Sequence, residues 1–393
     1  MPQLIVSIII LLLVIGCSQE TQTITYIQPI TPLPTPLSPT PATTSLEYLP
    51  ARPQLSETYP QAILDFLNAD VQHKHRLDEL LTVWDAEQSV IASPPEGVPV
   101  LEDDLDGDSR NDILITLPIP YSGSFMTIYE TDNGQYQGSV YTYPESLDAT
   151  RIWQVADINE DGKREVVIRG NSCGTHTCFL TIIILQWSDD VYRELLNVNQ
   201  SYATATFRDM DGDDIVELVL EGGTIGSVGA GMQRTQTDVY TWDGQTYQYT
   251  ATTFDPVASQ HPYWQLLDGN TALAEHQYDQ AIMFYQKAIA AQPPYPLLNE
   301  NVDVDVIKAA ARFQLMFTYV QLEDDAAVRN TYQMAQQEDG MYATWTKTFI
   351  DVYEQNRDVL VACEAAQTVT SDIYLPGYNY ATHALGVDGV LCS

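Results

Sequence analysis

The stretch Asp104-Leu-Asp106-Gly-Asp108-Ser-Arg-Asn-Asp112 decides the fold, because closely similar stretches occur twice more along the chain. The later copies read Asp157-Ile-Asn159-Glu-Asp161-Gly-Lys-Arg-Glu165 and Asp209-Met-Asp211-Gly-Asp213-Asp-Ile-Val-Glu217. The first aspartates of successive copies lie 53 and 52 residues apart. Such regular spacing predicts an internal structural repeat.

Oxygen-bearing side chains occupy positions 1, 3, 5 and 9 of every copy. Calcium prefers about six to eight oxygen ligands, and the backbone carbonyl at position 7 can add another. Carboxylates that are crowded together without a cation repel one another and tend to hold protons. Bound calcium should therefore stabilise the folded state. The sequence thus predicts about three calcium sites, one in each copy.

Each acidic loop is expected to lie between β-strands. Apolar β-type runs follow the loops directly, namely Ile113-Leu114-Ile115, Val166-Val167-Ile168 and Leu218-Val219-Leu220. Turn signals such as Asp132-Asn133-Gly134 separate further strands. The region 97–254 is therefore predicted to form three four-stranded units, with one strand before each loop and three after it. A unit of about 52 residues has the size of a propeller blade.

The triplicated loop resembles the FG-GAP or VCBS repeat, a calcium-bearing blade of integrin α-chain propellers and of many bacterial surface proteins. In that family the loop joins the first two strands of a blade and holds one calcium ion. The resemblance implies that the following side chains are ligands: Asp104, Asp106, Asp108 and Asp112; Asp157, Asn159, Asp161 and Glu165; Asp209, Asp211, Asp213 and Glu217. It also implies that the backbone oxygens of Arg110, Lys163 and Ile215 complete the three shells.

Two other calcium-binding families fit poorly. An EF-hand needs a bidentate Glu at position 12, where this chain has Ile115, Ile168 or Leu220. Dockerin loops lie closer together and lead into helices. Closed propellers typically have about four or more blades, so three blades leave three arrangements open. These are an open arc capped by helices, a ring with an unrecognised degenerate blade, and a ring completed by two chains.

The first 17 residues have the features of a processed secretion signal. The run Leu4 to Ile15 is apolar with one serine and is too short to span a bilayer as a mature helix. It ends at Gly16-Cys17 in a pattern that resembles the bacterial lipoprotein signal, although the leader carries no Lys or Arg. The resemblance implies a lipidated Cys17 and an extracytoplasmic protein anchored to a bacterial membrane; the alternative is an ordinary secretory signal. Residues 18–58 are rich in Thr, Pro and Ser and predict an extended linker.

The remaining cysteines fit an oxidising compartment. The chain has five cysteines, and lipidation of Cys17 leaves four. Disulfides Cys173–Cys178 and Cys363–Cys392 are expected outside the cytosol. At the first pair, a zinc site formed by Cys173, His176 and Cys178 is the alternative.

Helical periodicity flanks the β region on both sides. Apolar residues at i, i+3 and i+4 spacing predict a helix over 59–92 within an amphipathic segment 59–95, which ends at two prolines. The region 256–370 is predicted to be helical as well. Residues 371–393 are expected to be irregular.

Part of the helical region is similar to tetratricopeptide repeats. The residues Ala281, Tyr285 and Ala288 have the spacing of the second helix of that repeat. Tyr332 and Ala335 match it less fully. The resemblance implies a helical domain with a groove for a protein or peptide; any amphipathic helical hairpin is the alternative.

Composition and motifs limit the possible functions. The chain has 53 acidic and 17 basic residues and a formal net charge of −36, which repels nucleic acid. It contains no nucleophile elbow, Walker lysine or HExxH motif. Two function classes stay open: a non-catalytic module that binds a protein or glycan, and an enzyme acting on polysaccharide. The lack of a recognisable catalytic set favours the binding module.

Overall fold

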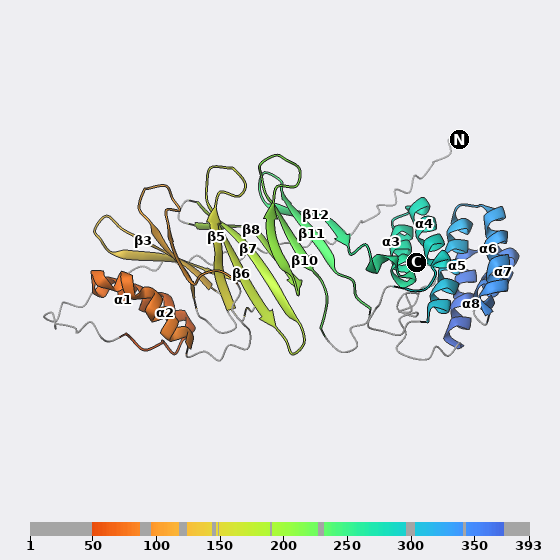
Figure 1. Ribbon diagram of the computed structural model, residues 1–393, viewed down its shortest axis with the longest axis horizontal. Helices are drawn as coiled ribbons and strands as arrows, with labels where there is room; N and C mark the ends of the chain where they lie inside the picture. The colour runs from red at the N-terminus through yellow and green to blue at the C-terminus, as the bar shows by residue number, and fades with distance from the viewer. Residues whose placement is uncertain are drawn as a thin grey trace, which may run out of the picture.

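The computed structural model describes residues 49–86, 96–117, 124–143, 147, 149–188, 191–226, 232–295, 303–340 and 343–372. The described elements form an elongated row, with a helical pair at one end, three β-sheets in the middle and a helical region at the other end (Figure 1). The linker predicted at 18–58 lies largely outside these residues. Cys17 lies outside them, and so does the predicted tail 371–393 apart from residues 371 and 372, which are helical.

The β region consists of three four-stranded antiparallel sheets, each with its strands in sequence order. This confirms the predicted units of one strand before the acidic loop and three after it. The first sheet contains β1 (Val100–Asp103), β2 (Asp112–Leu117), β3 (Ser124–Glu130) and β4 (Tyr136–Thr142). The second contains β5 (Ala149–Ala156), β6 (Glu165–Cys173), β7 (Cys178–Ser188) and β8 (Val191–Ser201). The third contains β9 (Thr204–Arg208), β10 (Glu217–Gly222), β11 (Gln236–Trp242) and β12 (Tyr247–Phe254).

The sheets are held together by apolar side chains on both faces of their central strands. In β6, Val166 and Ile168 pack toward the first sheet, whereas Val167 packs toward the third. Successive side chains of a strand point to opposite faces. A strand that is buried on both faces therefore needs a continuous apolar run instead of an alternating one. This explains why an uninterrupted apolar run follows each acidic loop.

The three sheets form an open row and do not close into a propeller (Figure 1). Within this one chain the described sheets match the open arc, and a ring completed by two chains stays a prediction. The helices α1 (Tyr59–Ala69) and α2 (Leu77–Ala86) cover the outer face of the first sheet. Leu80, Trp84 and Ile63 are fully buried there beside Ile115 and Met126.

The helix predicted over 59–92 is interrupted at Asp70, and residues 87–92 lie outside the described residues. The helix α1 ends before Asp70, and the 3-10 helix η2 (Val71–Arg76) separates it from α2. The Asp70 side chain accepts a hydrogen bond from the backbone N–H of Gln72 and so caps the next turn. Aspartate favours such caps over helix interiors. The ring of His73 in η2 stacks on Phe66 of α1 with centroids 4.2 Å apart.

The C-terminal part is helical, as predicted. It contains α3 (Pro262–Ala274), α4 (Tyr278–Ala290), α5 (Val304–Gln321), α6 (Asp325–Glu338), α7 (Ala343–Asn356) and α8 (Val359–Asp372). Sequential helices pack as hairpins, and α5 also contacts α3 and α7. Gly269 of α3 lies against the buried Tyr285 of α4, where a Cβ would come within 2.4 Å of the ring. A small residue is therefore required for these two helices to approach.

The third sheet and the helical region are joined by a buried arginine. The Arg234 guanidinium lies 3.6 Å from the ring centroid of Phe254 and 4.7 Å from that of Trp264. Its two terminal nitrogens donate to the carboxylate of Asp268 at 2.9 and 2.5 Å. Nearby, Met232 packs into the core of the helical region. Planar guanidinium groups combine bidentate pairing with ring stacking, so Arg234 fixes the helices to the sheet.

A pH-dependent contribution to stability is expected from His261, which begins α3. Its Nδ1 accepts a hydrogen bond from the Tyr263 N–H at 3.2 Å, and the residue is 5% exposed. Burial lowers the pKa of His261 to about 4, whereas an unfolded histidine ionises near about 6.5. Between these values the unfolded chain binds a proton that the folded chain excludes. Stability from this site is therefore complete above about pH 6.5 and is lost as pH falls toward 4.

The variant His261→Asn keeps a side-chain acceptor but does not titrate in this range. We expect the wild type to lose about 2 kcal/mol more stability than His261→Asn between pH 7 and 4. Urea unfolding at both pH values measures the difference. Equal losses in the two proteins would contradict this role of His261.

Candidate metal-binding loops

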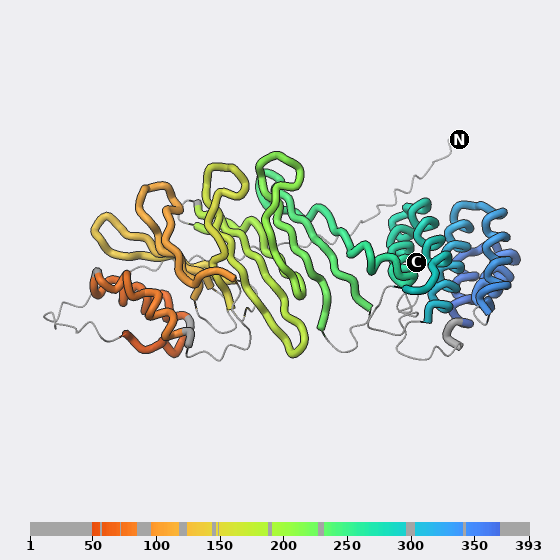
Figure 2. Tube along the Cα trace, in the orientation of Figure 1, coloured from red at the N-terminus to blue at the C-terminus, as the bar shows by residue number. Residues whose placement is uncertain are grey.

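Each acidic loop joins the first two strands of its sheet, where the sequence predicted it. The loops connect β1 to β2, β5 to β6 and β9 to β10. They project from the same long edge of the row and are coloured orange, yellow and yellow-green in Figure 2. The repeat therefore places three acidic sites along one edge of the molecule.

The carboxylate at position 9 closes every loop through the same hydrogen bond. Asp112 accepts from the N–H of Leu105 at 3.1 Å, and Glu165 accepts from the N–H of Ile158 at 3.0 Å. Glu217 accepts from the N–H of Met210 at 2.8 Å. All three acids are buried, with exposed fractions of 7%, 0% and 3%. The last acid of each repeat thus ties the start of the second strand to position 2 of the loop.

The backbone turns in the same way in all three loops. Positions 4 and 6 have positive φ in every copy, between 55° and 84°. These positions are Gly107 and Ser109, Glu160 and Gly162, and Gly212 and Asp214. One position of each pair is glycine, for which positive φ carries no steric cost. Three different sequences therefore adopt one loop conformation.

The aspartates at positions 1 and 5 accept hydrogen bonds from the loop backbone. Asp104 accepts from the N–H groups of Gly107 and Ser109, and Asp157 accepts from those of Asp161 and Gly162. At position 7, the N–H groups of Arg110, Lys163 and Ile215 each donate to the position-5 aspartate, at 2.8, 2.9 and 3.0 Å. These bonds hold the carboxylates around the inside of the turn. Coordination by the position-7 carbonyls stays a prediction.

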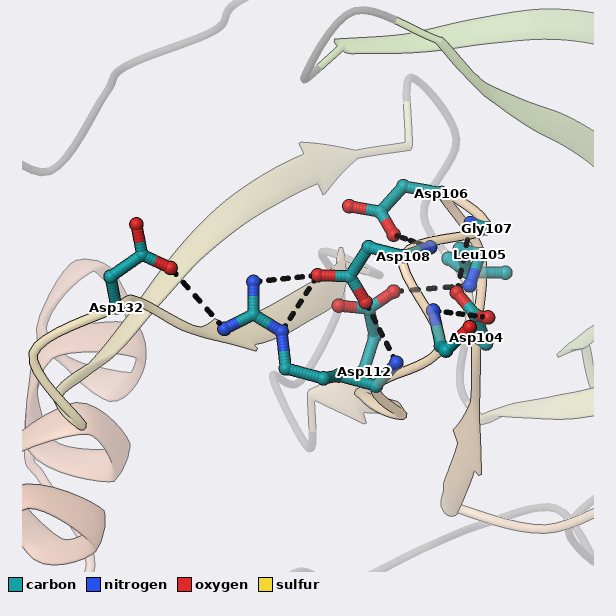
Figure 3. Close-up of polar contacts among 9 residues, drawn as sticks. Asp104, Leu105, Asp106, Gly107, Asp108, Asp112 and Asp132 are labelled. Atoms are coloured by element: carbon teal, nitrogen blue, oxygen red, sulfur yellow. Dashed lines mark hydrogen bonds and ion pairs between the residues drawn. The ribbon is translucent and has the colours of Figure 1, made fainter.

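In the first loop, Asp104, Asp106 and Asp108 come together at one side of the turn (Figure 3). One ligand atom from each lies within 4.8 Å of the others. The Arg110 side chain pairs with Asp108 and also approaches Asp132 of the β3–β4 turn. Burial raises the pKa of Asp112 to about 6, and the neighbouring aspartates add to the shift. The negative charge of this loop is only partly balanced by Arg110.

In the third loop, the group is formed by Asp209, Asp211 and Glu217, again within 4.8 Å. The Oε1 atom of Glu217 is buried and has no hydrogen-bond partner among the described residues. A buried carboxylate oxygen without a partner is costly. A cation held between these three acids would supply that partner.

The second loop differs from the other two. The acids predicted as ligands in this loop, Asp157, Asp161 and Glu165, do not form such a group within the described residues. The amide of Gln186 in β7 instead donates to Asp161 at 2.7 Å and to Glu165 at 2.8 Å. Burial still raises the pKa of Glu165 to about 7, although the Gln186 bond opposes this. The neutral Asn159 at position 3 further reduces the charge of this loop.

Gln186 is the site residue that the sequence analysis missed. It lies opposite Glu165 on the neighbouring strand and is 3% exposed. Its only signal in the sequence is a polar residue within the apolar run of β7. That run alone does not reveal which loop the side chain reaches.

The donor set fits calcium better than softer metals. The gathered groups contain carboxylate oxygens and no sulfur or imidazole, and hard cations such as calcium prefer oxygen ligands. Asp112 and Asp213, also predicted as ligands, are not part of the gathered groups. The two gathered groups thus supply three carboxylates each, and the remaining predicted ligands stay predictions.

The structure tests one of the two predicted disulfides. Cys173 and Cys178 form a disulfide, as predicted. The alternative zinc site with His176 is wrong, because both sulfurs are used in this bond. Cys363 is buried in α8, and Cys392 lies outside the described residues, so their pairing stays a prediction.

Comparisons with protein-family models, with curated proteins and with solved structures gave no match. The resemblances to calcium-bearing blades and to tetratricopeptide repeats therefore stay predictions from the sequence. None of the helices in the described ranges combines the length and apolarity needed to cross a bilayer.

Loss of the Gln186 amide should weaken the fold. Replacing Gln186 with Leu leaves Asp161 and the buried Glu165 without this donor, and we expect a loss of about 1–3 kcal/mol in the free energy of unfolding. The matched control is Gln248→Leu on the exposed strand β12, which should change stability by less than about 0.5 kcal/mol. Urea unfolding measures both variants. Indistinguishable values would show that the Gln186 bonds contribute nothing.

Proposed function

We propose that this protein is a calcium-stabilised, non-catalytic binding module anchored outside the cytoplasm by a lipid on Cys17. The observation that carries the calcium assignment is the recurrence of one acidic loop with one backbone conformation at the same place in three sheets. Repeated placement of carboxylates at a turn is expected when each turn holds the same cation. The stack of sheets then presents the binding surface.

The electrostatics of the loops support a bound cation. Asp112 and Glu165 have raised pKa values because they are buried near other carboxylates. In the third loop, Glu217 has a buried oxygen without a partner. A dication would remove these unfavourable terms, and a ligand that binds only the folded state stabilises it. Calcium therefore has a structural role in this proposal.

The loops are expected to differ in affinity. The first and third loops each gather three carboxylates, whereas the second is already bridged by Gln186. Calcium affinity rises with the number of charged ligands. We infer that the first and third loops bind calcium more tightly than the second.

The cellular location rests on the sequence. The lipoprotein-like signal at Cys17 and the Pro-rich linker predict a tethered protein outside the cytoplasm. The Cys173–Cys178 disulfide is consistent with an oxidising compartment. The helical hairpins, with their likeness to tetratricopeptide repeats, favour binding of a protein or peptide.

Catalysis is not supported by the described cavities. Two surface cavities of about 330 and 520 Å³ have no Asp or Glu among their lining residues. A glycosidase needs a pair of carboxyl groups beside the scissile bond. We favour binding over the alternative of an enzyme acting on polysaccharide, because the sequence contains no recognisable catalytic motif.

Calcium removal tests the main proposal. We expect excess EDTA to lower the melting temperature and calcium to restore it, whereas magnesium at equal ionic strength restores it poorly. At a calcium concentration about 100 times Kd, the stabilisation of one site is about 2.7 kcal/mol. Differential scanning calorimetry measures the shift. Identical melting curves in EDTA and in calcium would exclude the metal assignment.

Two matched variants separate the loops. Glu217→Gln should remove more of the calcium-dependent shift than Glu165→Gln, because Gln186 already occupies the second loop. Each variant is compared with the wild type in EDTA, so that the metal-free stability is known. A larger loss in Glu165→Gln would reverse the assigned order of affinities.

The lipid anchor has its own test. We expect Cys17→Ser to release the protein from the membrane fraction, because one lipidated cysteine is the only proposed membrane attachment. Fractionation of cells with and without detergent measures this. If Cys17→Ser stays in the membrane fraction, the lipid anchor is refuted, whereas the proposal of calcium binding is unaffected.

A further inference from the structure

A cavity of about 330 Å³ lies at the end of the second sheet that is opposite to the acidic loops. The strand β6 starts at its loop with Glu165 and ends at Cys173, so the two sites lie at opposite ends of the strand. The cavity is lined by residues of β6 and β7 and by the connection between β8 and β9, among them Arg169, Phe179, Tyr202 and Ala203. The calcium proposal makes no use of this cavity.

Arg169 supplies a positive charge to the cavity wall. Its side chain is only 11% exposed, and its guanidinium lies 4.5 Å from the ring centroid of Trp153. The Nε atom is buried and has no acceptor among the described residues. Burial lowers the pKa of Arg169, because desolvation disfavours the charged form. Because Nε is shielded, a ligand can reach only the terminal nitrogens, and an anionic group there would offset the cost of burying this charge.

The ion pair that Arg169 does form is easily replaced. Its Nη1 donates to Glu96 at 2.7 Å, but the Glu96 side chain is 75% exposed. Ion pairs with exposed partners contribute about 0–1 kcal/mol. The carboxylate of a ligand can therefore compete with Glu96 for the guanidinium.

Aromatic rings border the same cavity. Phe179 and Tyr202 are 38% and 48% exposed, which is high for side chains of this size. Tyr202 has a φ of 46°, and its hydroxyl donates to the carbonyl oxygen of His176 within the disulfide loop. Gly226 packs against both groups, since a Cβ there would lie 1.9 Å from the His176 oxygen. The rim is thus held in place by the disulfide loop and by these contacts.

The charge of the protein limits which anions can bind. A net charge of −36 repels phosphate-rich polymers, and Arg169 is the one cation among the lining residues that the structure describes. These conditions suit a ligand with one carboxylate per binding unit. A pyranose ring presents C–H groups to aromatic side chains, whereas a peptide C-terminus would need several backbone partners beside its carboxylate. Asn171 is the one amide side chain in the lining.

We propose that the cavity beside Arg169 binds the carboxylate of an acidic sugar, with Arg169 as the anchoring residue and Phe179 and Tyr202 as ring-contacting residues. This inference rests on the proposed binding function and names the class of its ligand. The guanidinium matches the planar geometry of a carboxylate. The site is separate from the calcium loops, so sugar binding and the calcium-dependent change in melting temperature can be measured independently.

The experiment uses the full chain in calcium-containing buffer and a minimal pair of probes, methyl glucuronide and methyl glucoside, which differ in the carboxylate. NMR titration should show binding of the glucuronide and none of the glucoside at the same concentration. Arg169→Gln should weaken glucuronide binding about tenfold or more, because it removes a charge-assisted hydrogen bond. Glu96→Gln should strengthen it about two- to fivefold, because it removes the competitor.

Two further variants control for folding and for general charge. Ala203→Leu should abolish binding by filling the cavity while Arg169 is retained, and circular dichroism checks that it folds. Arg208→Gln removes an exposed arginine that is paired with Glu221 on the third sheet and should leave binding unchanged. Equal binding of glucuronide and glucoside, or weaker binding by Glu96→Gln, would overturn the proposal.

A tripeptide with a free C-terminus that competes as well as the glucuronide would overturn the sugar assignment. Absence of glucuronide binding combined with an intact calcium-dependent melting shift would refute this site and leave the calcium proposal standing. Glucuronide binding without any calcium-dependent shift would support the site and refute the calcium loops.

Discussion

The structure depends on the burial of apolar side chains on both faces of successive four-stranded sheets. The central strands of the first two sheets place alternate residues in two different cores, so each of these sheets is covered by apolar contacts on both faces. In a propeller, closure into a ring covers both faces of every sheet with a neighbouring sheet. Here the first sheet is covered by α1 and α2 instead, and the row stays open. The outermost strand β12 ends the row with mainly exposed residues, many of them threonines.

The acidic loops follow from this arrangement. In each sheet, the strand that enters the core begins with an acid, and that acid turns back to bind the N–H at position 2 of the loop. Packing of the central strand buries the acid, and burial raises the pKa of Asp112 and Glu165. The fold thus places negative charge where water cannot solvate it fully, which a cation or a donor must balance. In the second loop a neutral amide does this, and for the other two loops we propose that calcium does.

The sequence alone predicted the sheets, the position of the loops and the first disulfide, because these depend on local signals. An acidic turn followed by an apolar run predicts a strand regardless of what packs on that strand. The disulfide was predictable because Cys173 and Cys178 flank a short turn and are therefore close in space. The break at Asp70 was missed because the apolar spacing continues across it. The role of Gln186 was missed because its partners lie more than 20 residues earlier in the chain. The open row could not be chosen from sequence, since it depends on which surface α1 and α2 cover.

The contact between α1 and β4 has a consequence for the behaviour of the protein in concentrated surroundings. Asn68 accepts from the N–H of Tyr136 at 2.8 Å and donates to the carbonyl oxygen of the same residue at 3.0 Å. This side chain imitates a neighbouring strand and occupies hydrogen-bonding groups that an edge strand would otherwise offer to another molecule. The helix that covers the first core therefore also blocks part of the exposed edge of β4 from pairing with a strand of another molecule.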